Sequence, residues 1–288
     1  SEVTVFDLFC GCGGASTGLV GAAAQVGQRV ENLVAVNHWD KAVETHRRNH
    51  PWATVLHEDV SRVDPLDHLR PGTVQLGLAG PSCTQHSRAR GGKPINDQER
   101  THAWDVVRWA KKLEPESLLI ENVPEFRDWS PVDAEGKIIP SRKGEYFREF
   151  LAALRRLGYN VDHRVLCAAH YGDATTRRRL FVQARRGQLT WPEPSHRLAD
   201  EQPGLFDLPV ARSAREIIDW NLPGESIWTR KRPLADKTMQ RIVEGLKRFA
   251  GGPFIIPQMS GGVVRSVNDP LPTVTGTSCA RLVEPFLL

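Results

Sequence analysis

Residues 3–26 read VTVFDLFCGCGGASTGLVGAAAQV, and this stretch decides the fold. Val3–Phe9 has the apolar run of a short strand, Gly11–Gly14 makes a turn, and Ala15–Val26 has the small and apolar residues at the spacing of a helix. A strand that passes through a glycine turn into a helix is the repeating unit of a parallel sheet. The opening of the chain therefore predicts an α/β protein.

The same order of elements recurs as far as residue 184. Leu33–Val36 is followed by the helical stretch Asp40–Asn49. Further short buried strands are expected at Thr54–Leu56, Val74–Leu78, Leu118–Ile120 and Arg179–Val182, with helical patterns at 101–113 and 145–157. This alternation predicts a doubly wound, mostly parallel sheet, and we assign residues 1–184 to it as one domain.

The alternation of strands and helices ends at about residue 185. Trp191-Pro192-Glu193-Pro194 and scattered prolines follow, and Ala235–Phe249 is the one clear helical pattern. The segment 185–250 holds 12 Lys and Arg against 9 Asp and Glu, which is a mild basic excess. We expect residues 185–288 to form a small, irregular second region that recognises the substrate.

Composition limits the class of protein. The chain has 288 residues, 40% of them hydrophobic, and a formal charge of +4, which favours anionic partners without establishing one. No apolar stretch approaches the roughly 20 residues needed to cross a bilayer, so no membrane association is expected and the predicted location is cytoplasmic. The five cysteines are an odd number without paired metal spacing, so neither disulfides nor a metal site is expected; Cys10 and Cys12 are interpreted as small apolar filler.

Ligands of open parallel sheets bind beyond the carboxyl ends of the strands, so reactive side chains are expected at these ends. In the first such segment, Phe6–Gly14, glycines let the backbone approach a ligand at a helix N-terminus. A dinucleotide site would require a third glycine where Ser16 stands and an acidic residue where the second strand ends in Asn37. The segment therefore predicts a nucleotide-like cofactor other than a dinucleotide.

Two later segments each place a reactive group at a strand end. Residues 77–87 read GLAGPSCTQHS, so Cys83 follows an apolar run and a Gly-Pro break, where it is either a nucleophile or an inert thiol. In residues 118–124, LLIENVP, an apolar strand delivers Glu121, and a charged group there costs desolvation unless it is paired or used. Pro124 ends the strand, which favours a functional Glu121 over a solvated one.

The fourth segment is TTRRRLFV at residues 175–182, an arginine cluster that enters a strand. A solvated charge run is the alternative interpretation. Strand alternation, however, is expected to turn Arg177 and Arg179 to the same side.

In this order, the four segments resemble the cytosine-5 DNA methyltransferase family of bacterial or phage type over roughly residues 3–184. The resemblance implies a Rossmann-like, S-adenosylmethionine-dependent methyltransferase that acts on double-stranded DNA, as in restriction-modification. It implies that Cys83 adds to carbon 6 of a flipped cytosine while Glu121 hydrogen-bonds ring N3, and that Arg177 and Arg179 brace the active site.

The resemblance also implies the residues that bind S-adenosylmethionine. Asp59 would accept from the adenine amino group, and Asn37 and His38 would lie beside ribose and adenine, with Trp39 a second choice for stacking. The loop residues assigned to the cofactor are Phe9, Gly11, Gly13 and Gly14.

Several positions depart from the family pattern. Asn37 stands where a ribose-binding glutamate is usual, Ser82 replaces a proline, and Thr84 and Thr175 replace glutamines. The closing motifs of the family are not visible before residue 288. Two alternatives therefore stay open: a tRNA cytosine-5 methyltransferase, and one half of a split enzyme, which acts as a nucleic-acid-binding subunit and needs a second polypeptide for the missing motifs.

Overall fold

The computed structural model describes residues 2–81, 102–133, 137–202, 207–257, 262–274 and 280–285. The chain divides into two compact units. The first unit comprises Ser1–Val165 with Arg179–Trp191, and the second comprises Leu166–Arg178 with Pro192–Leu288. The second unit thus begins earlier in the chain than the region predicted from residue 185, and the assignment of a function to each part stays a prediction.

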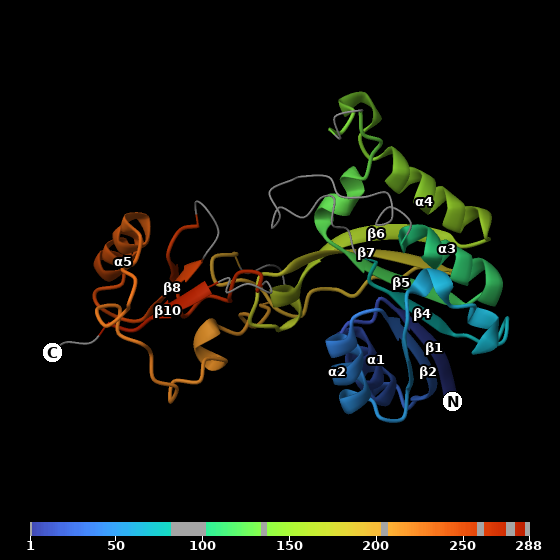
Figure 1. The fold of residues 1–288 in the computed structure, drawn as a ribbon, viewed down its shortest axis with the longest axis horizontal. Coiled ribbons are helices and arrows are strands. Elements are labelled where there is room, and N and C mark those ends of the chain that lie inside the picture. Colours follow the sequence, from blue (N-terminus) through green and yellow to red (C-terminus); the bar gives the residue numbers. More distant parts are fainter. Residues whose placement is uncertain are drawn as a thin grey trace. The chain divides into compact units, whose positions relative to one another are not determined.

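A seven-stranded sheet has the order β3-β2-β1-β4-β5-β7-β6 (Figure 1). The pairs β1/β2, β2/β3, β1/β4 and β4/β5 are parallel, and β5/β7 is antiparallel. The predicted mostly parallel sheet is confirmed. The strands are β1 (Glu2–Leu8), β2 (Arg29–Asn37), β3 (Thr54–His57), β4 (Leu76–Ala79), β5 (Ser117–Asn122), β6 (Asn160–Cys167) and β7 (Arg178–Arg185).

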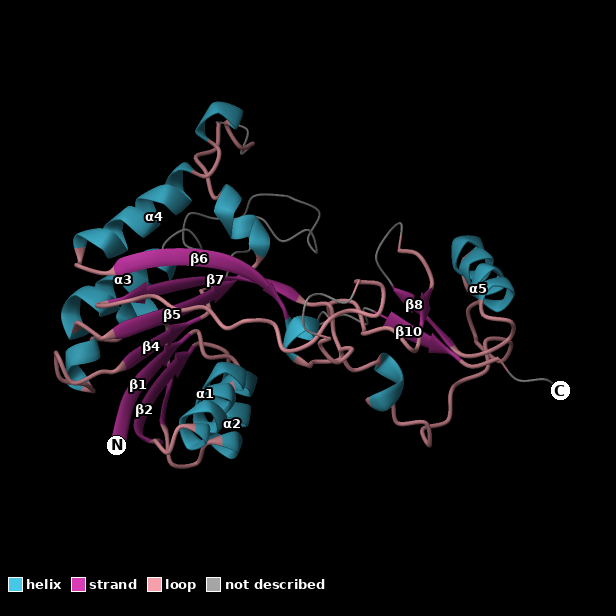
Figure 2. Ribbon diagram, turned by 180° about the vertical axis from the view of Figure 1, so that it is seen from behind, coloured by secondary structure: helices cyan, strands magenta, loops and turns pink. Residues whose placement is uncertain are grey.

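Helices cover both faces of this sheet. Figures 1 and 2 show α1 and α2 on one side and α3 and α4 on the other. Alternation along the central strand β1 explains the arrangement, because Val3 and Val5 pack in the cluster that contains α1, whereas Phe6 and Leu8 pack in the cluster that contains α3 and α4. The helices are α1 (Gly14–Gln25), α2 (Asp40–Asn49), α3 (His102–Leu113) and α4 (Glu145–Arg156).

The edge strand β6 was not predicted from the sequence. Its residues, NVDHRVLC, mix polar and apolar types, and most of them are only half-buried. A strand at the edge of a sheet buries less of its surface than a central one, so its sequence carries neither a continuous apolar run nor a strict alternation. It lies at the edge of the sheet beside β7, the next strand along the chain, so pairing with β7 and not its own pattern defines it.

Within the second unit, a three-stranded antiparallel sheet has the order β10-β8-β9. Its strands are β8 (Phe254–Pro257), β9 (Arg265–Ser266) and β10 (Ala280–Val283), and helix α5 (Asp236–Arg248) is the helix predicted at 235–249. A methyl group on Gly245 of α5 would lie 2.1 Å from the Phe254 ring, so glycine lets helix and strand pack closely. The region expected to be irregular therefore has a small core of its own.

Short 3-10 helices connect these elements: η1 (Val60–Arg62), η2 (Pro65–Asp67), η5 (Pro124–Asp128), η6 (Pro140–Arg142), η7 (Ala168–Tyr171) and η8 (Ala214–Glu216). In the described ranges, none of the helices is both long and apolar enough to span a bilayer.

Candidate active site

The loop between β1 and α1 is built from left-handed backbone. Phe9, Gly11 and Gly13 have φ values of +57°, +54° and +90°. A side chain at Gly13 would also be obstructed, because its Cβ would lie 2.9 Å from Cδ2 of His46. Phe9 adopts a conformation that ordinary residues avoid at a cost of about 1–3 kcal/mol, which is characteristic of functional sites.

The helix that follows this loop begins without a cap from any side chain. Gly13 is the N-cap of α1, and the first turn contains no acidic residue. Backbone N–H groups of a first turn have no acceptor inside the helix, and the helix dipole favours negative charge there. The loop and the start of α1 together suit a ligand that carries a carboxylate.

A network of buried polar side chains lies next to the loop between β1 and α1. The Ser16 hydroxyl donates to Asp7 Oδ2 at 2.6 Å and lies 3.2 Å from Nε2 of His46, while the Thr17 hydroxyl lies 3.0 Å from Nε2 of His50. Burial raises the pKa of Asp7 to about 6, and burial followed by His50 lowers the pKa of His46. Sequence reasoning missed this network; the signal was a carboxylate inside the apolar strand.

The two cysteines of the loop differ. Cys10 is buried among Ala35, Val43 and Val55, and burial raises the pKa of its thiol. Cys12 is exposed. The interpretation as small apolar filler is therefore confirmed for Cys10 and wrong for Cys12.

The end of β2 shapes the next part of the site. Asn37 is buried, and its side-chain oxygen accepts from the backbone N–H of Trp39 at 2.9 Å, which turns the chain from β2 into α2. Nε2 of His57 donates to the carbonyl of His38 at 3.1 Å. The indole of Trp39 is exposed and offers an apolar face at this edge of the sheet.

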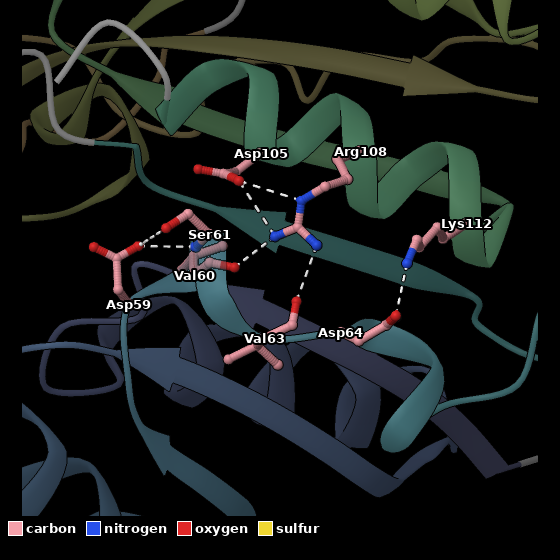
Figure 3. A network of polar contacts seen from close by, with 8 residues as sticks. All are labelled: Asp59, Val60, Ser61, Val63, Asp64, Asp105, Arg108 and Lys112. Atoms are coloured by element: carbon pink, nitrogen blue, oxygen red, sulfur yellow. Dashed lines mark hydrogen bonds and ion pairs between the residues drawn. The ribbon is translucent and has the colours of Figure 1, made fainter. Parts of the chain in front are cut away.

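Asp59 lies directly beyond β3 and caps the short helix η1 (Figure 3). Its Oδ1 accepts from the backbone N–H of Ser61 at 2.8 Å and from the Ser61 hydroxyl at 2.7 Å. The pKa of Asp59 is lowered, chiefly by the hydroxyl of Ser61 and further by its backbone N–H, His102 and His38. Asp59 is therefore an ionised acceptor at neutral pH.

His102, at the start of α3, is a further residue of this site that the sequence did not reveal. Its ring lies 4.9 Å from the ring of Phe9, centre to centre. Its charge also contributes to the lowered pKa of Asp59. His102 thus connects two residues that the sequence assigned separately to the cofactor.

Cys83 lies outside the described residues, and so do Ser82 and Thr84. The described chain reaches Pro81, two residues before Cys83. Nδ2 of Asn122 donates to the carbonyl of Pro81 at 2.9 Å. A side chain at the end of β5 thus fixes the backbone two residues before the predicted nucleophile.

Glu121 and Arg179 form an ion pair, with 2.8 Å between Arg179 Nε and Glu121 Oε1. In the antiparallel β5/β7 register Glu121 is opposite Phe181, so Arg179, two residues earlier, is its diagonal neighbour on the same face. The Glu121 side chain is 38% exposed and the Arg179 side chain is 18% exposed. The carboxylate is therefore fixed by a charged donor and is accessible to a ligand.

The Glu121–Arg179 pair lies beside the loop after β1. A methyl group on Gly80 would lie 3.8 Å from the carbonyl oxygen of Phe9 and 3.9 Å from Oε2 of Glu121. The structure thus brings together Phe9 and Glu121, which are 112 positions apart in the sequence. Parallel strands explain the proximity, because their carboxyl ends meet at one edge.

Arg177 differs from Arg179. β7 begins at Arg178, and Arg177 precedes it in the second unit. There its N–H donates to the Thr175 hydroxyl at 3.2 Å and its carbonyl accepts from Ala168 N at 2.9 Å. Arg177 therefore lies outside the strand, and the prediction that strand alternation turns it to the same side as Arg179 does not apply. Its role in the active site stays a prediction.

The second unit presents an aromatic and basic segment. Trp228 is 78% exposed, and Arg230, Lys231 and Arg232 after it are exposed as well. An indole face next to cations matches the stacking and phosphate contacts by which proteins bind nucleic acids. Over the described ranges, no group of three His, Cys, Asp or Glu side chains is arranged to hold a metal ion.

Comparison with known proteins gives one family and several relatives. The family model described as C-5 cytosine-specific DNA methylase matches residues 3–248. The type II methyltransferase M1.HphI of Haemophilus parahaemolyticus is 30% identical over 202 residues, covering 68% of this chain and 50% of the relative. DNA (cytosine-5)-methyltransferase 1 of Mus musculus is 27% identical over 212 residues, covering 68% of this chain and 12% of the relative.

Solved structures share the fold. A protein encoded within an E. coli prophage has a TM-score of 0.56 and 21% identity, covering 94% of this chain and 82% of that one. Spodoptera frugiperda DNMT2 has a TM-score of 0.53 and 21% identity, covering 77% and 61%. The chain spans about half the length of the first bacterial relatives that it matches.

Proposed function

The chain belongs to the C-5 cytosine-specific DNA methylase family, and we propose that it transfers a methyl group from S-adenosylmethionine to carbon 5 of cytosine in duplex DNA. The observation that carries this proposal is the Glu121–Arg179 pair beside Phe9 and Gly80, because it sets a fixed carboxylate next to a loop shaped for a cofactor. We call the residues at the ends of β4, β5 and β7 (Cys83, Glu121, Asn122, Arg179) the base half. Those after β1, β2 and β3 (Phe9, Gly11, Gly13, Gly14, Asn37, His38, Asp59) are the cofactor half.

The base half carries the chemistry of the proposal. Carbon 5 of cytosine is a poor nucleophile, so the thiolate of Cys83 adds to carbon 6 while a proton shared between the Glu121 carboxyl group and ring N3 joins the two in a hydrogen bond, which builds carbanion character at carbon 5. Carbon 5 would then form its bond to the methyl group as the bond between that methyl group and the cofactor sulfur breaks and leaves a neutral thioether. Carbon 5 would lose its proton to a base or water, and the ring would expel the Cys83 thiolate. Arg179 holds the Glu121 carboxylate in place through its Nε donor.

The residues of the cofactor half fit S-adenosylmethionine in three respects. The loop of Phe9, Gly11 and Gly13 has a left-handed backbone, the uncapped start of α1 favours a carboxylate, and the ionised Asp59 can accept from an amino group. The sulfonium of the bound cofactor would supply the electrophilic methyl group. Asn37, which is engaged with Trp39 N, would provide a neutral contact to ribose where the family usually has a charged one.

The substrate base must leave the duplex before Cys83 can reach carbon 6, so we propose base flipping. Trp228 and the cations of residues 230–232 support contact with nucleic acid in the second unit. Arg177 is proposed to assist this contact or to brace the active site. The type II relatives favour a modification role alongside a restriction enzyme, in the cytoplasm where DNA and cofactor meet.

Tritiated S-adenosylmethionine with duplex DNA and with tRNA, side by side, tests the function. We expect label in DNA, and in the DNA strand that contains 5-fluorocytosine we expect a covalent adduct that survives denaturation. Label in tRNA alone would select the RNA alternative. Label in neither contradicts catalysis by this chain alone; the assay is then repeated with a candidate C-terminal polypeptide, and restored turnover would select the split enzyme.

A further inference from the structure

The segment that carries Asp59 is held by an arginine on a distant helix (Figure 3). From α3, Arg108 donates through Nη1 to the carbonyl of Val63 at 2.9 Å and through Nη2 to the carbonyl of Val60 at 2.6 Å. These carbonyls lie at the two ends of η1. One guanidinium therefore spans the whole short helix that Asp59 caps.

A buried carboxylate orients that guanidinium. Oδ1 of Asp105 accepts from Nε of Arg108 at 3.3 Å and from Nη2 at 3.2 Å. The Asp105 side chain is 8% exposed, and burial raises its pKa although Arg108 opposes the rise. The planar fork of arginine can satisfy a carboxylate and two carbonyls together, which the point charge of lysine cannot do with the same geometry.

Asp59 fixes the other side of η1. Its Oδ1 accepts both bonds from Ser61, so η1 is held at its N–H groups by Asp59 and at its carbonyls by Arg108. Among the described residues, no hydrogen bond of the structure falls on Oδ2 of Asp59. The orientation of this oxygen depends on η1, and η1 depends on Arg108.

The contacts form a stripe along one side of α3. His102, Asp105, Arg108 and Lys112 follow one another at intervals of three, three and four residues, which places them on one helix face. His102 reaches Phe9, Arg108 reaches Val60 and Val63, and Lys112 reaches Asp64 at 2.7 Å. α3 therefore connects the loop after β1 with the segment after β3.

We propose that Arg108 is a positioning residue for cofactor binding, which holds residues 59–63 so that Asp59 presents its carboxylate to the amino group of S-adenosylmethionine. The inference rests on the proposed function and adds a residue that does not itself touch the cofactor. Without the guanidinium, the carbonyls of Val60 and Val63 lose their donors. The carboxylate of Asp59 is then no longer held in one orientation.

The test uses the full chain with Arg108→Gln, Arg108→Lys and, as the matched control, Lys112→Gln. The control removes one cation from the same stripe, but its partner Asp64 caps η2 and not η1. We expect the Arg108 variants to bind S-adenosylmethionine about 10-fold to 100-fold more weakly in calorimetry, which is the value of one hydrogen bond to a charged group. The control should stay within about twofold.

Two further measurements separate positioning from general stability. Amide hydrogen exchange of the free variants should accelerate at Arg62 and Val63 in Arg108→Gln and stay at the wild-type rate in Lys112→Gln. In turnover, Arg108→Lys should raise KM for the cofactor and change kcat little. Should Arg108→Gln fail to fold, Arg108→Lys, which retains the charge and the stem, carries the same comparison.

The possible failures are distinguishable. Unchanged cofactor affinity in the Arg108 variants, or equal weakening by Lys112→Gln, overturns the inference and leaves the proposed function standing. Unchanged exchange at Arg62 and Val63 also overturns it. A wild-type chain that does not bind S-adenosylmethionine contradicts the proposed function itself, whatever the exchange shows.

Discussion

The cofactor half presents backbone, whereas the base half presents charged side chains. In the first, Phe9, Gly11 and Gly13 adopt left-handed conformations, and buried groups behind them fix the loop. In the second, Glu121 and Arg179 are held by each other at the ends of adjacent strands. A loop can match the shape of a ligand, but a group that handles charge in a reaction must be a side chain with a defined partner.

The two halves should therefore respond differently to substitution. Changes in the base half should lower kcat and leave cofactor binding nearly intact, whereas changes in the cofactor half should weaken binding or stability first. Four substitutions, in order of decreasing effect on turnover, test this contrast.

Cys83→Ala should abolish methyl transfer and the covalent adduct with 5-fluorocytosine, because the nucleophile is absent. Folding should be retained, as measured by circular dichroism and thermal unfolding. Cys12→Ala, which removes the exposed thiol of the loop after β1, is the control and should still form the adduct. Methylation that persists in Cys83→Ala would exclude the proposed chemistry.

Glu121→Gln should reduce kcat by about 10²-fold to 10⁴-fold, the range for one positioned group that handles a proton. Calorimetry should find S-adenosylmethionine affinity almost unchanged. Glu116→Gln, at the residue immediately before the same strand, is the matched control. If cofactor binding and kcat fell together, Glu121 would belong to the cofactor half.

Gly13→Ala should act mainly on binding and stability. An L residue in the left-handed region costs about 1–2 kcal/mol, and the new methyl group would meet His46. We expect a lower free energy of unfolding and a raised KM for the cofactor. Gly18→Ala, where the added methyl group meets open space within α1, should instead stabilise the chain by about 0.5–1 kcal/mol. Equal effects at both positions would show that the left-handed turn is unimportant.

Asp7→Asn should change turnover at pH 7 least, because Asp7 touches neither substrate nor cofactor in the proposal. Its effect lies in the pH dependence of stability. The raised pKa of about 6 means that the folded state binds a proton more readily than the unfolded state, whose pKa is 3.8. The stability contribution of protonated Asp7 is full below pH 3.8 and is lost as pH rises through 6.

Wild type should therefore lose on the order of 3 kcal/mol more than Asp7→Asn between pH 4 and pH 7, since one pKa unit corresponds to about 1.4 kcal/mol. Denaturant unfolding of both proteins over this range measures the difference. Burial, followed by the charge of His50, lowers the pKa of His46, whose Nε2 lies 3.2 Å from the Ser16 hydroxyl. Identical pH profiles would show that Asp7 is not protonated on folding.

The sequence predicted the fold of the first unit well. Strong local signals carried that prediction: central strands with apolar runs, such as Val3–Phe9, and helices with regular periodicity between them. The edge strand β3 was predicted at Thr54–Leu56, but the other edge strand, β6, and the sheet of the second unit were missed. β6 and β9 are only partly buried and are defined by their pairing partners. Glu121 was selected from the sequence because it stands at the end of an apolar strand, whereas Asp59 was assigned from the resemblance to the cytosine-5 DNA methyltransferase family.

The sequence by itself determined which residues carry reactive groups and at which strand ends they stand. Only the tertiary structure decided what holds them. Arg108 meets Val60 across 48 positions, Ser16 meets His46 across 30, and His102 meets the Phe9 ring across 93. Periodicity and turn chemistry depend on near neighbours, whereas these contacts depend on how helices pack on a sheet, which no local pattern specifies.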